Sequence, residues 1–475
     1  MKVLMAASEV FPFCKTGGLA DVTGSLPVAL AEGGDEVAVI LPLYDLIGGY
    51  WREKMTSRGY IYIDLGWRHQ YCGLYSLEYR GVTWYFVDNE QYFRRGKIYG
   101  EFDDGERFAF FCKAVVDLLP SLNWMPDVIH CNDWQTALIP VYLKDVGTRW
   151  EAVRNIHTVF TIHNVEYQGR YGHEMLTDVF GLNEGWWSDG TLQMDGDINL
   201  MKAALMVSDK VTTVSPTYAH QLHNSYYAHR MESVIDRIGD KLRGVLNGLD
   251  VVTYDPATDS EIPERYSVEN MTGKAVCKAC LQAELGLQVD PKAPIIAVVS
   301  RMARHKGIDM ICEVLDKMMI FGIQVVVLGK GEGYLEDFFK SQASHYGGRL
   351  AVRMGYDESL SHRVYAGSDM LLMPSKSEPC GLSQMIAMRY GTVPIVRKTG
   401  GLNDSVRSCQ AGQENGTGFV FENYNPYDML YVIGQAVEMY HRDAATFAAV
   451  QKNGMTEDFS WNKSAGVYHE IYSGL

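Results

Sequence analysis

The sequence predicts an α/β fold built on doubly wound parallel sheets. Two observations support this prediction: short, unbroken apolar runs recur along the chain, and a helical pattern follows each run after glycine or polar residues. Strands buried on both faces of a parallel sheet have such unbroken runs, and the intervening helices cover the two faces. The predicted strands are residues 2–7, 36–41, 128–131, 158–162, 210–214, 295–299, 324–328, 350–354, 370–373 and 393–396.

The strand–helix alternation breaks once, between residues 245 and 294. That region holds a strand-like run at 244–246, a polar stretch with Pro256 and Pro263, and a helical pattern at 273–285. We therefore expect two Rossmann-like domains, residues 1–248 and 249–459, and a closing helix at about 460–475 that returns to the N-terminal domain. Ligands of such sheets bind beyond the carboxyl ends of the strands, so we expect the site in a deep cleft that both domains face.

Composition and charge exclude several classes of partner. Hydrophobic residues make up 47% and charged residues 21%, as in a folded globular chain. Lys plus Arg number 43 and Asp plus Glu 58, and the resulting net charge of −15 predicts that neither nucleic acid nor a membrane is a partner. No run reaches the ~18 apolar residues of a membrane span. The nine scattered cysteines predict free thiols and a cytoplasmic location.

The first strand leads into a glycine pair, Gly17-Gly18, and then into a helical pattern that ends at Glu32. Glycines between a strand and a helix let the backbone approach a ligand closely, and the helix N-terminus offers unpaired N–H groups to an anion. The spacing is that of neither a dinucleotide fingerprint nor a Walker loop. A phosphate-binding turn and a plain turn both remain open from spacing alone.

Two loops of the C-terminal half also carry charge where a strand ends. Arg301 and Lys306 follow the strand 295–299, where cations would meet a diphosphate, although a solvated basic loop has the same composition. Glu378 follows the strand 370–373 and precedes a predicted helix start, whose amides at 381–383 would point at the ligand. The alternative for Glu378 is a helix-capping carboxylate.

These loops, taken with other segments, resemble those of bacterial glycogen synthases and plant starch synthases in order and spacing, over essentially the whole chain. The pair K-T-G-G-L-A-D-V and E-P-C-G-L is the most specific part of this resemblance. The resemblance implies a GT-B fold and a retaining glucosyltransferase that adds glucose from ADP-glucose to the non-reducing 4-OH end of an α-1,4-glucan, and the Met-Lys-Val start resembles the bacterial form. The matching segments are residues 15–22, 132–134, 161–164, 214–216, 247–250, 301, 306–307, 378–382 and 397–401.

The resemblance also implies which residues bind the leaving group. Arg301 and Lys306 would hold the diphosphate, with help from amides near Gly18 and Ser383. Lys15 would reach the same diphosphate from the N-terminal domain. No cofactor is implied beyond the nucleotide-sugar co-substrate.

Further residues would surround the sugar and the base. Glu378 would bind glucose hydroxyls, and His163, Asp133 and Asn247 would line the pocket of the reacting sugar, with the His163 carbonyl facing the anomeric carbon. Tyr356 would stack on the base. The resemblance adds Gly17, Asp21, Cys380, Gly381 and Leu382 as substrate contacts, Asp21 to ribose or sugar.

Two short acidic or thiol motifs could suggest a metal. Cys277 and Cys280 form a lone C-x-x-C inside a predicted helix, where ordinary helix cysteines explain them more simply. Asp195 and Asp197 resemble the D-x-D metal motif of the other glycosyltransferase fold, but Asp197 directly precedes a helical pattern at 198–207, which predicts that it is the N-cap. Because cationic loops already neutralise the leaving group, we expect no metal.

The reaction expected for this family needs a neutralised leaving group more than an enzyme acid. We favour a same-face displacement, in which the leaving phosphate accepts the acceptor proton, over a double displacement through Glu378 or Asp133. Departures from the family pattern, Lys376-Ser377 and the run 329–333, leave donor preference open. The rivals are a GT-B enzyme with another acceptor, a silent glucan-binding protein and a nicotinamide dehydrogenase.

Overall fold

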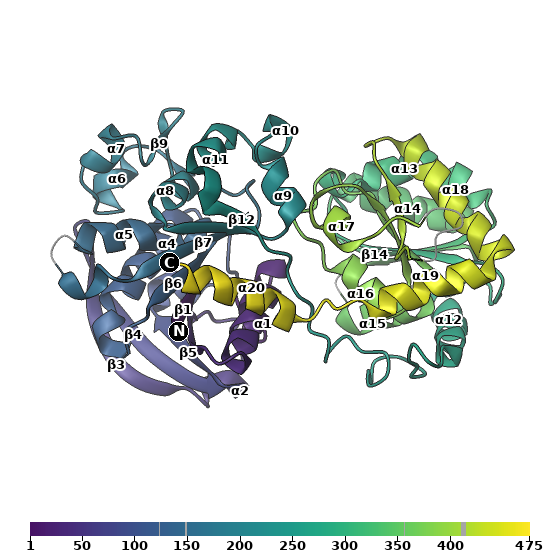
Figure 1. The fold of residues 1–475 in the computed structure, drawn as a ribbon, viewed down its shortest axis with the longest axis horizontal. Helices are drawn as coiled ribbons and strands as arrows, with labels where there is room; N and C mark the ends of the chain where they lie inside the picture. The colour runs from purple at the N-terminus through teal and green to yellow at the C-terminus, as the bar shows by residue number, and fades with distance from the viewer. Residues whose placement is uncertain (123, 148–149, 356, 410–414) are drawn as a thin grey trace. The chain divides into compact units, whose positions relative to one another are not determined.

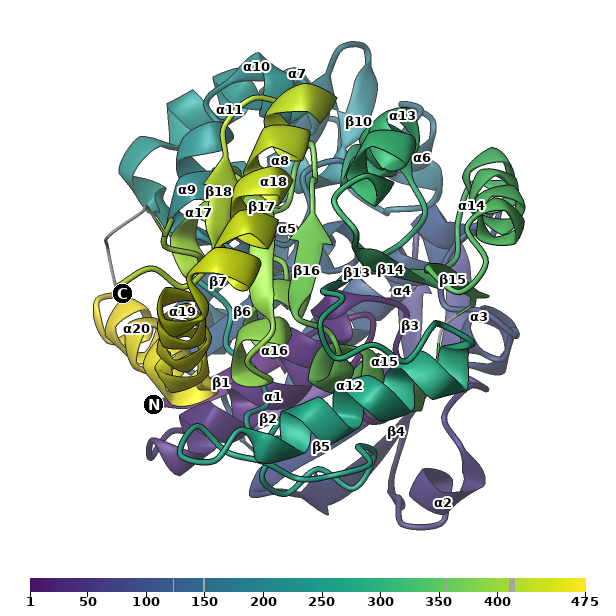
Figure 2. The same cartoon turned by 90° about the vertical axis from the view of Figure 1, so that its right-hand side faces the viewer.

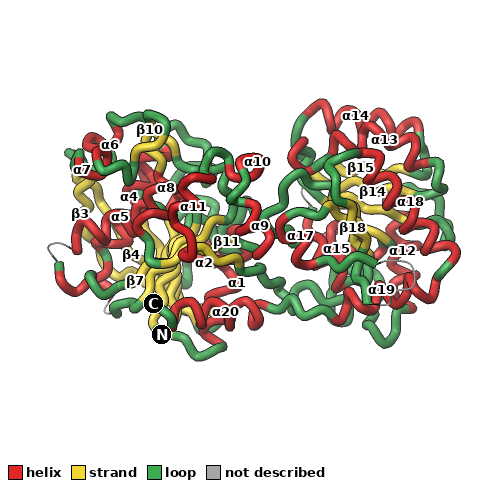
Figure 3. The backbone as a smooth tube through the Cα atoms, turned by 45° about the horizontal axis from the view of Figure 1, so that its top comes forward, coloured by secondary structure: helices red, strands yellow, loops and turns green. Residues whose placement is uncertain are grey.

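The computed structural model describes residues 1–122, 124–147, 150–355, 357–409 and 415–475. Over these residues the chain divides into two compact units, Met1–Gly248 with Trp461–Leu475, and Leu249–Ser460. In each unit the central parallel strands lie between helices (Figure 1, Figure 3). The predicted α/β class with parallel sheets is therefore confirmed.

The main sheet of the N-terminal unit runs in the order β12-β11-β7-β6-β1-β2-β5-β4-β3. The strands from β12 to β5 are parallel, whereas β4 and β3 continue the sheet antiparallel at its edge. A small separate sheet pairs β8, β10 and β9. The strands are β1 Lys2–Ala6, β2 Glu36–Pro42, β3 Thr56–Leu65, β4 Arg68–Tyr79, β5 Val82–Asp88, β6 Val128–Asn132, β7 His157–Ile162, β8 Arg170–Tyr171, β9 Gln193–Met194, β10 Asp197–Asn199, β11 Lys210–Thr213 and β12 Leu242–Gly244.

Helices of this unit pack against the sheet and against one another. The longest are α1 and α4, and α4 packs against α5 and β3. The helices are α1 Gly18–Glu32, α2 Gly49–Arg52, α3 Glu90–Phe93, α4 Asp104–Asp117, α5 Leu138–Gly147, α6 Met175–Asp178, α7 Gly185–Ser188, α8 Leu200–Val207, α9 Pro216–Gln221, α10 Ser225–Ala228, α11 Glu232–Ile238 and α20 Trp461–Ser473.

The last helix, α20, completes the core of the N-terminal unit. It packs against α1 (Figure 1), and its Tyr472 hydroxyl bonds Nδ1 of the buried His130 on β6 at 2.7 Å. Burial lowers the pKa of His130 to about 3, so the imidazole is neutral. At the entry to the helix, a Cβ on Gly248 would lie 2.6 Å from Trp461 Cα, so only glycine fits there.

The C-terminal unit has one parallel sheet in the order β15-β14-β13-β16-β17-β18. Helix α12 lies beside α15 (Figure 2). The strands are β13 Ile295–Val299, β14 Gln324–Gly329, β15 Leu350–Met354, β16 Met370–Met373, β17 Val393–Arg397 and β18 Phe419–Phe421. The helices are α12 Thr272–Leu285, α13 Ile308–Met319, α14 Gly333–His345, α15 Glu358–Gly367, α16 Ser383–Arg389, α17 Gly400–Ser405, α18 Pro426–Arg442 and α19 Ala444–Thr456.

The structure corrects two local predictions and adds strands that the sequence analysis did not identify. The strand expected at 244–246 ends at Gly244. Asp197 belongs to β10 and does not cap a helix; Asn199 caps α8 instead, its side chain accepting the Lys202 N–H at 2.9 Å. The strands β3 to β5 were not predicted. Among the described residues, no helix has both the length and the apolar character that a membrane crossing requires.

Removing Trp461–Leu475 should loosen the N-terminal unit alone. The truncation uncovers the buried faces that Trp461 and Tyr472 close, so backbone amides of β6 and α1 should exchange with deuterium about tenfold faster or more. Amides of β13 and β16 should keep their rates. Hydrogen-exchange mass spectrometry of the full chain and the truncated chain measures both, and an equal acceleration in β13 would contradict this role of α20.

Candidate functional site

Glu9 organises the loop that joins β1 to α1. Its carboxylate accepts hydrogen bonds from the Thr16 backbone N–H, from the Thr16 hydroxyl at 2.8 Å and from the Gly17 N–H at 3.3 Å. Burial raises the pKa of this carboxyl, and the bonds from Thr16 and Gly17 oppose that rise. A buried acceptor therefore holds the glycine pair in place beside the N-terminus of α1.

Lys15 and Asp21 form an ion pair at the start of the same helix. The Lys15 Nζ lies 2.7 Å from Asp21 Oδ1, and both side chains are between one quarter and one third exposed. The ammonium also lies 5.7 Å from the centre of the Phe11 ring. The structure thus brings together these two predicted ligand-binding residues, one on each side of the glycine pair in sequence.

Asp133 and His163 meet at the carboxyl ends of two adjacent strands, β6 and β7. Asp133 has a positive φ of 56°, and its Oδ1 accepts the His163 backbone N–H at 2.8 Å. Burial raises the pKa of Asp133 to about 7, although backbone N–H groups of His163 and Asn164 oppose that rise. The positive φ is unusual for a residue with a side chain, and it marks a position where function can impose strain.

The ring of His163 is fixed as well. Its Nε2 lies 2.9 Å from Asn132 Oδ1, while the Asn132 amide nitrogen donates to the Ala6 carbonyl at 3.1 Å. With that orientation of the amide, His163 Nε2 must carry the proton and Nδ1 the lone pair. Burial lowers the pKa of His163 to about 3, so the ring is neutral.

Asn247 lies beyond β12, the outermost of the parallel strands. The residue is 6% exposed, and its Oδ1 has no hydrogen-bond partner among the described residues. An unpaired buried amide oxygen is costly unless a ligand satisfies it. This observation agrees with the predicted place of Asn247 in the sugar pocket.

A cavity of ≈ 420 Å³ lies in the segments that follow Asp133 and His163. Trp134 directly follows Asp133, and Tyr167 lies three residues beyond Asn164, to whose carbonyl its N–H donates at 3.3 Å. The lining combines aromatic faces with hydrogen-bonding side chains. It consists of Trp134, Glu166, Tyr167, Gln168, Gly169, Arg170 and His229.

The D-x-D segment beside this cavity is neutralised by arginines. Arg170 lies 3.1 Å from Asp197 and 3.9 Å from Asp195, and Arg230 lies 3.2 Å from Asp195. In the part of the chain that the structure describes, no three His, Cys, Asp or Glu side chains gather as metal ligands. All nine cysteines lie in that part and are free thiols, with Cys277 buried and Cys280 exposed.

In the C-terminal unit, Lys306 and Glu378 form a two-point ion pair. The ammonium lies 2.8 Å from Oε1 and 2.6 Å from Oε2, and the Ser375 hydroxyl donates to Oε2 at 2.9 Å. The side chains are 16% and 8% exposed. Glu378 is therefore not a helix cap: α16 begins at Ser383 after the N-cap residue Leu382.

Arg301 lies on the same loop as Lys306 but is exposed. Its Nη2 lies 3.3 Å from Nε2 of His305. The segment that follows β14 holds this loop in place. The Met302 N–H donates to the Lys330 carbonyl at 3.0 Å, and the Glu332 N–H donates to the Met302 carbonyl at 2.7 Å. The run 329–333, which departs from the family pattern, thus supports the loop of Arg301 and Lys306 through backbone hydrogen bonds.

The loop of Glu378 is built on glycines that no other residue could replace. Gly400 has a φ of 44°, and a Cβ there would overlap the Glu378 carbonyl oxygen; a Cβ on Gly401 would overlap that of Cys380. The Gly401 N–H donates to the Glu378 carbonyl at 3.1 Å. Close backbone contact between the two loops fixes where Glu378 stands.

The remaining residues of this loop lie at its end. Cys380 is buried, with its Sγ 3.4 Å from the Gly381 carbonyl oxygen, and Gly381 has a φ of 75°. The Ser383 side chain bonds the Tyr365 phenol. Tyr356, the predicted stacking residue, lies outside the described residues.

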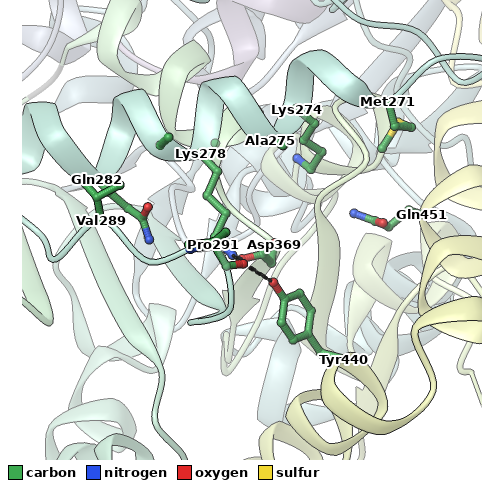
Figure 4. Close-up of a pocket in the computed structure, with 12 residues that line it drawn as sticks. Met271, Lys274, Ala275, Lys278, Gln282, Val289, Pro291, Asp369, Tyr440 and Gln451 are labelled. Atoms are coloured by element: carbon green, nitrogen blue, oxygen red, sulfur yellow. Dashed lines mark hydrogen bonds and ion pairs between the residues drawn. The ribbon is translucent and has the colours of Figure 1, made fainter.

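A second cavity, of ≈ 370 Å³, lies in the C-terminal unit (Figure 4), at the edge of the sheet where its strands begin, opposite the edge that carries Lys306 and Glu378. Its lysines are already engaged: Lys274 donates to the carbonyls of Ala366 and Tyr390, and Lys278 pairs with Asp369 at 2.8 Å. Burial lowers the pKa of Lys274 to about 7. These contacts fasten α12 to the sheet, and we assign no ligand to them.

The structure adds residues that sequence reasoning did not select. Glu9, Asn132 and Ser375 hold predicted site residues by direct hydrogen bonds, and Arg397 donates to the Lys376 carbonyl at 2.7 Å. Each lies within a few residues of a strand end. The sequence signal that could have identified them is a polar residue at the end of a buried strand, because a buried polar group there needs a hydrogen-bond partner.

Comparisons with known proteins agree with this architecture and identify its class. A family model described as the starch synthase catalytic domain matches residues 2–237, and one described as glycosyl transferases group 1 matches residues 286–448. The catalytic domain of starch synthase IV from Arabidopsis thaliana, solved with ADP and acarbose, has a TM-score of 0.92 and 31% identity, covering 100% of this chain and 99% of that one. The fold is that of a GT-B glycosyltransferase.

Relatives define the family. The glycogen synthases of Anoxybacillus flavithermus and Geobacillus stearothermophilus are each 44% identical over 475 residues, covering 100% of this chain and 98% of theirs, and that of Bacillus cereus is 42% identical with full coverage of both. The chain belongs to the glycogen synthase and starch synthase family. A sucrose-phosphate synthase from Thermosynechococcus elongatus, at 17% identity and a TM-score of 0.61, shares the fold alone.

Replacing Asp133 by asparagine should change how stability depends on pH. In the native wild type the carboxyl keeps its proton up to about pH 7, whereas in the unfolded chain it loses the proton near pH ~3.9. Between these values the native state binds more protons, so the Asp133 contribution to stability falls as pH rises, by up to ~1.4 kcal/mol per pH unit. The amide of the variant does not titrate. Urea-unfolding midpoints from about pH 4.5 to 7 should therefore rise in Asp133→Asn relative to wild type, and parallel pH profiles would contradict the assignment.

Lys306→Ala should destabilise the C-terminal unit, whereas Arg301→Ala should not. Removing Lys306 leaves the carboxylate of Glu378 nearly buried without its cation, at a cost of about 3 kcal/mol. Arg301 is exposed, and its loss should stay within about 0.5 kcal/mol. Adding Glu378→Gln to Lys306→Ala should recover most of the loss. Thermal unfolding of the three variants measures this, and a double variant no more stable than Lys306→Ala would refute the coupling.

Proposed function

We propose that this chain transfers glucose from ADP-glucose to the non-reducing 4-OH end of an α-1,4-glucan with retention of anomeric configuration. The observation that supports this most directly is the Lys306–Glu378 pair at the carboxyl edge of a parallel sheet, with Arg301 on the same loop as Lys306. A cation that neutralises phosphate and a carboxylate that binds hydroxyls stand next to each other there. The starch synthase structure solved with ADP and acarbose and the glycogen synthase relatives support the same reaction class.

The leaving diphosphate is the proposed ligand of Arg301 and Lys306. An ammonium has three N–H donors, and the Lys306 ammonium directs two at Glu378. Its third can therefore bind a phosphate oxygen while the ion pair persists. Fixed cations act most strongly where charge develops as the bond to the anomeric carbon stretches. That Lys15, in the other unit, reaches the same diphosphate stays a prediction.

His163 is proposed to line the pocket of the reacting sugar as a neutral ring. A protonated imidazole would disfavour the positive charge that develops on an oxocarbenium-like sugar, and burial, which lowers the pKa of His163, prevents that protonation. The Asn164 N–H shares its peptide with the His163 carbonyl and bonds Asp133, so this bond fixes the direction in which the carbonyl would face the anomeric carbon. Asn247 Oδ1 is available for a sugar hydroxyl.

Neither candidate carboxylate is placed as a nucleophile. Glu378 is engaged by Lys306 and Ser375, and Asp133 by the N–H groups of His163 and Asn164. We therefore propose a same-face displacement: the acceptor 4-OH forms the new bond to C1, the bond from C1 to the diphosphate oxygen breaks, and the released phosphate takes the proton. A covalent glucosyl adduct on Glu378 or Asp133, trapped and identified by mass spectrometry, would refute this mechanism.

The cavity lined by Trp134 and Tyr167 is the proposed entry for the acceptor glucan. These aromatic residues suit the apolar faces of glucose rings, and the polar residues beside them suit the hydroxyls. The positive charge of Arg170 in this lining is already paired with Asp197, which is compatible with a neutral glucan. The cytoplasmic location and the independence of metal and cofactor stay predictions; activity in excess chelator tests the latter.

ADP-glucose should be the better donor, and Arg301→Ala should lower turnover with it. Because charge on the leaving phosphate grows toward the transition state, loss of one contact should reduce kcat by about 10²–10³-fold with a smaller change in KM. Radiolabel incorporation into glycogen from ADP-glucose and UDP-glucose measures both expectations, with circular dichroism as the folding control. A higher kcat/KM with UDP-glucose would overturn the donor assignment, and near-wild-type turnover of folded Arg301→Ala would overturn the role of the loop.

A further inference from the structure

The hairpin of β3 and β4, at the edge of the N-terminal sheet (Figure 1), has an aromatic outer face. Tyr60, Tyr62 and Tyr71 are 64%, 52% and 39% exposed, and Trp67 in the connecting turn is 76% exposed. Surface strands ordinarily carry charged or small polar residues on the solvent side, above all at a sheet edge. A cluster of exposed rings on one face of a hairpin therefore calls for a functional explanation.

The rings form a continuous row that we call the aromatic ladder, consisting of Tyr60, Tyr62, His69 and Tyr71. Tyr62 pairs directly with Tyr71 across the two strands, and Asp64 pairs with His69, so these residues share one face. The ring centres of Tyr60 and Tyr71 lie 5.6 Å apart, and those of Tyr62 and Tyr71 lie 6.5 Å apart. His69 stacks on Tyr62 at 4.6 Å with an interplanar angle of 9°.

The opposite face of the hairpin anchors the ladder to the protein. Ile63, Leu65 and Cys72 alternate with the ladder residues and are buried, and α4 packs against β3. The hairpin therefore has a core of its own on the inner side. Folding does not require rings on the outer side, where the exposed residues contribute little burial.

The polar atoms of the ladder are arranged for hydroxyl groups. The Asp64 carboxylate, 80% exposed, lies 2.6 Å from His69 Nδ1, which fixes the imidazole and directs hydrogen bonding to Nε2. The phenol groups of the tyrosines can donate and accept. From Tyr60 to Asp64 the strand spans ~13 Å at ~3.3 Å per residue, which is long enough for more than one hexose ring.

We propose that the aromatic ladder is a second glucan-binding surface, which retains an α-glucan polymer away from the reaction site. Hexose rings offer apolar C–H faces to the aromatic rings and hydroxyl edges to Asp64 and His69. The inference rests on the proposed function, since the polymer that the chain extends is the ligand. Two strands, β2 and β5, lie between β1 and the two strands of the ladder, so the ladder lies apart from the Glu9 loop and the Lys15–Asp21 pair.

Charge favours this neutral ligand over an anionic one. The ladder and the adjoining Asp64 carry one carboxylate and one imidazole, and the whole chain has a net charge of −15. A polyanion such as nucleic acid would be repelled. The remaining alternative is a second copy of the chain bound at the exposed edge strand, and the test below separates it.

The test compares Tyr60→Thr/Tyr62→Thr with wild type. Threonine keeps the strand preference while removing the rings. Glycogen binding, measured by retardation in native gels that contain glycogen, should weaken about tenfold or more, and the KM for glycogen should rise similarly. The kcat and KM with maltotetraose, which is too short to occupy both surfaces, should stay within about twofold of wild type.

Two control variants show whether an effect of the threonine variant comes from loss of the rings of the ladder. Tyr60→Phe/Tyr62→Phe keeps the rings and should bind glycogen within about twofold of wild type. Tyr431→Thr removes an equally exposed ring from α18 of the other unit and should have no effect. Wild-type glycogen binding in the folded threonine variant would overturn the proposal. A change from dimer to monomer in sedimentation, with glycogen binding retained, would show a contact between copies and overturn it too.

Failure of the proposed function gives a different result from failure of the proposed binding surface. A wild-type protein that transfers no glucose from either nucleotide sugar, yet binds glycogen through the ladder, would refute the reaction and leave the binding surface standing. A protein that transfers glucose at wild-type glycogen affinity after loss of the ladder would refute the surface and leave the reaction standing.

Discussion

Parallel alignment of strands places every strand-to-helix loop of a sheet at the same edge, and both units of this chain depend on that constraint. In the N-terminal unit the loops after β1, β6, β7 and β12 bring Glu9, Asp133, His163 and Asn247 to one edge. In the C-terminal unit the loops after β13 and β16 do the same for Lys306 and Glu378. Residues far apart in sequence meet because the strands before them run in one direction.

Three buried carboxyl groups at these edges are stabilised in three different ways. Glu9 is satisfied by backbone and hydroxyl donors of one loop, and Asp133 by the N–H groups of the next strand's loop. Glu378 instead has a full cation as its partner. The first two arrangements fix backbone geometry, whereas the third places a full positive charge beside the carboxylate. The same cost of burying a carboxyl group is thus met by neutral donors in two places and by an opposite charge in the third.

Much of the fold followed from the pattern of apolar runs. The central strands, such as β13 and β14, are buried on both faces and have the unbroken pattern that parallel sheets require. The hairpin β3–β4 was missed because its outer face is aromatic, so the apolar–polar alternation of a one-sided strand is absent there. The sequence analysis did not select Asn199 as the helix cap. The residues before α8 form β9 and β10, and the pairing of β10 with β9 and β8 is not visible in the local sequence.

The candidate site was predictable as a set of positions but not as a set of partners. Motifs indicated Lys306 and Glu378 separately, yet their direct pairing depends on two close backbone contacts, that of Gly307 with the Pro374 carbonyl oxygen and that of Gly400 with the Glu378 carbonyl oxygen. The hydrogen bond that fixes the His163 ring likewise passes through Asn132, whose amide is oriented by a carbonyl of β1. Such contacts depend on tertiary geometry, which no single segment of sequence contains.

The return of α20 to the N-terminal unit makes the C-terminal unit an insertion within the other in chain order. During synthesis on a ribosome, residues 249–460 emerge before Trp461, so the inserted unit can finish its sheet while the first still lacks its final helix. His130 and the surrounding apolar surface stay uncovered over that interval, until Tyr472 arrives. The order of translation thus leaves the N-terminal core as the last part of the molecule to close, and the nascent chain is most exposed to mispairing and to chaperone capture at that surface.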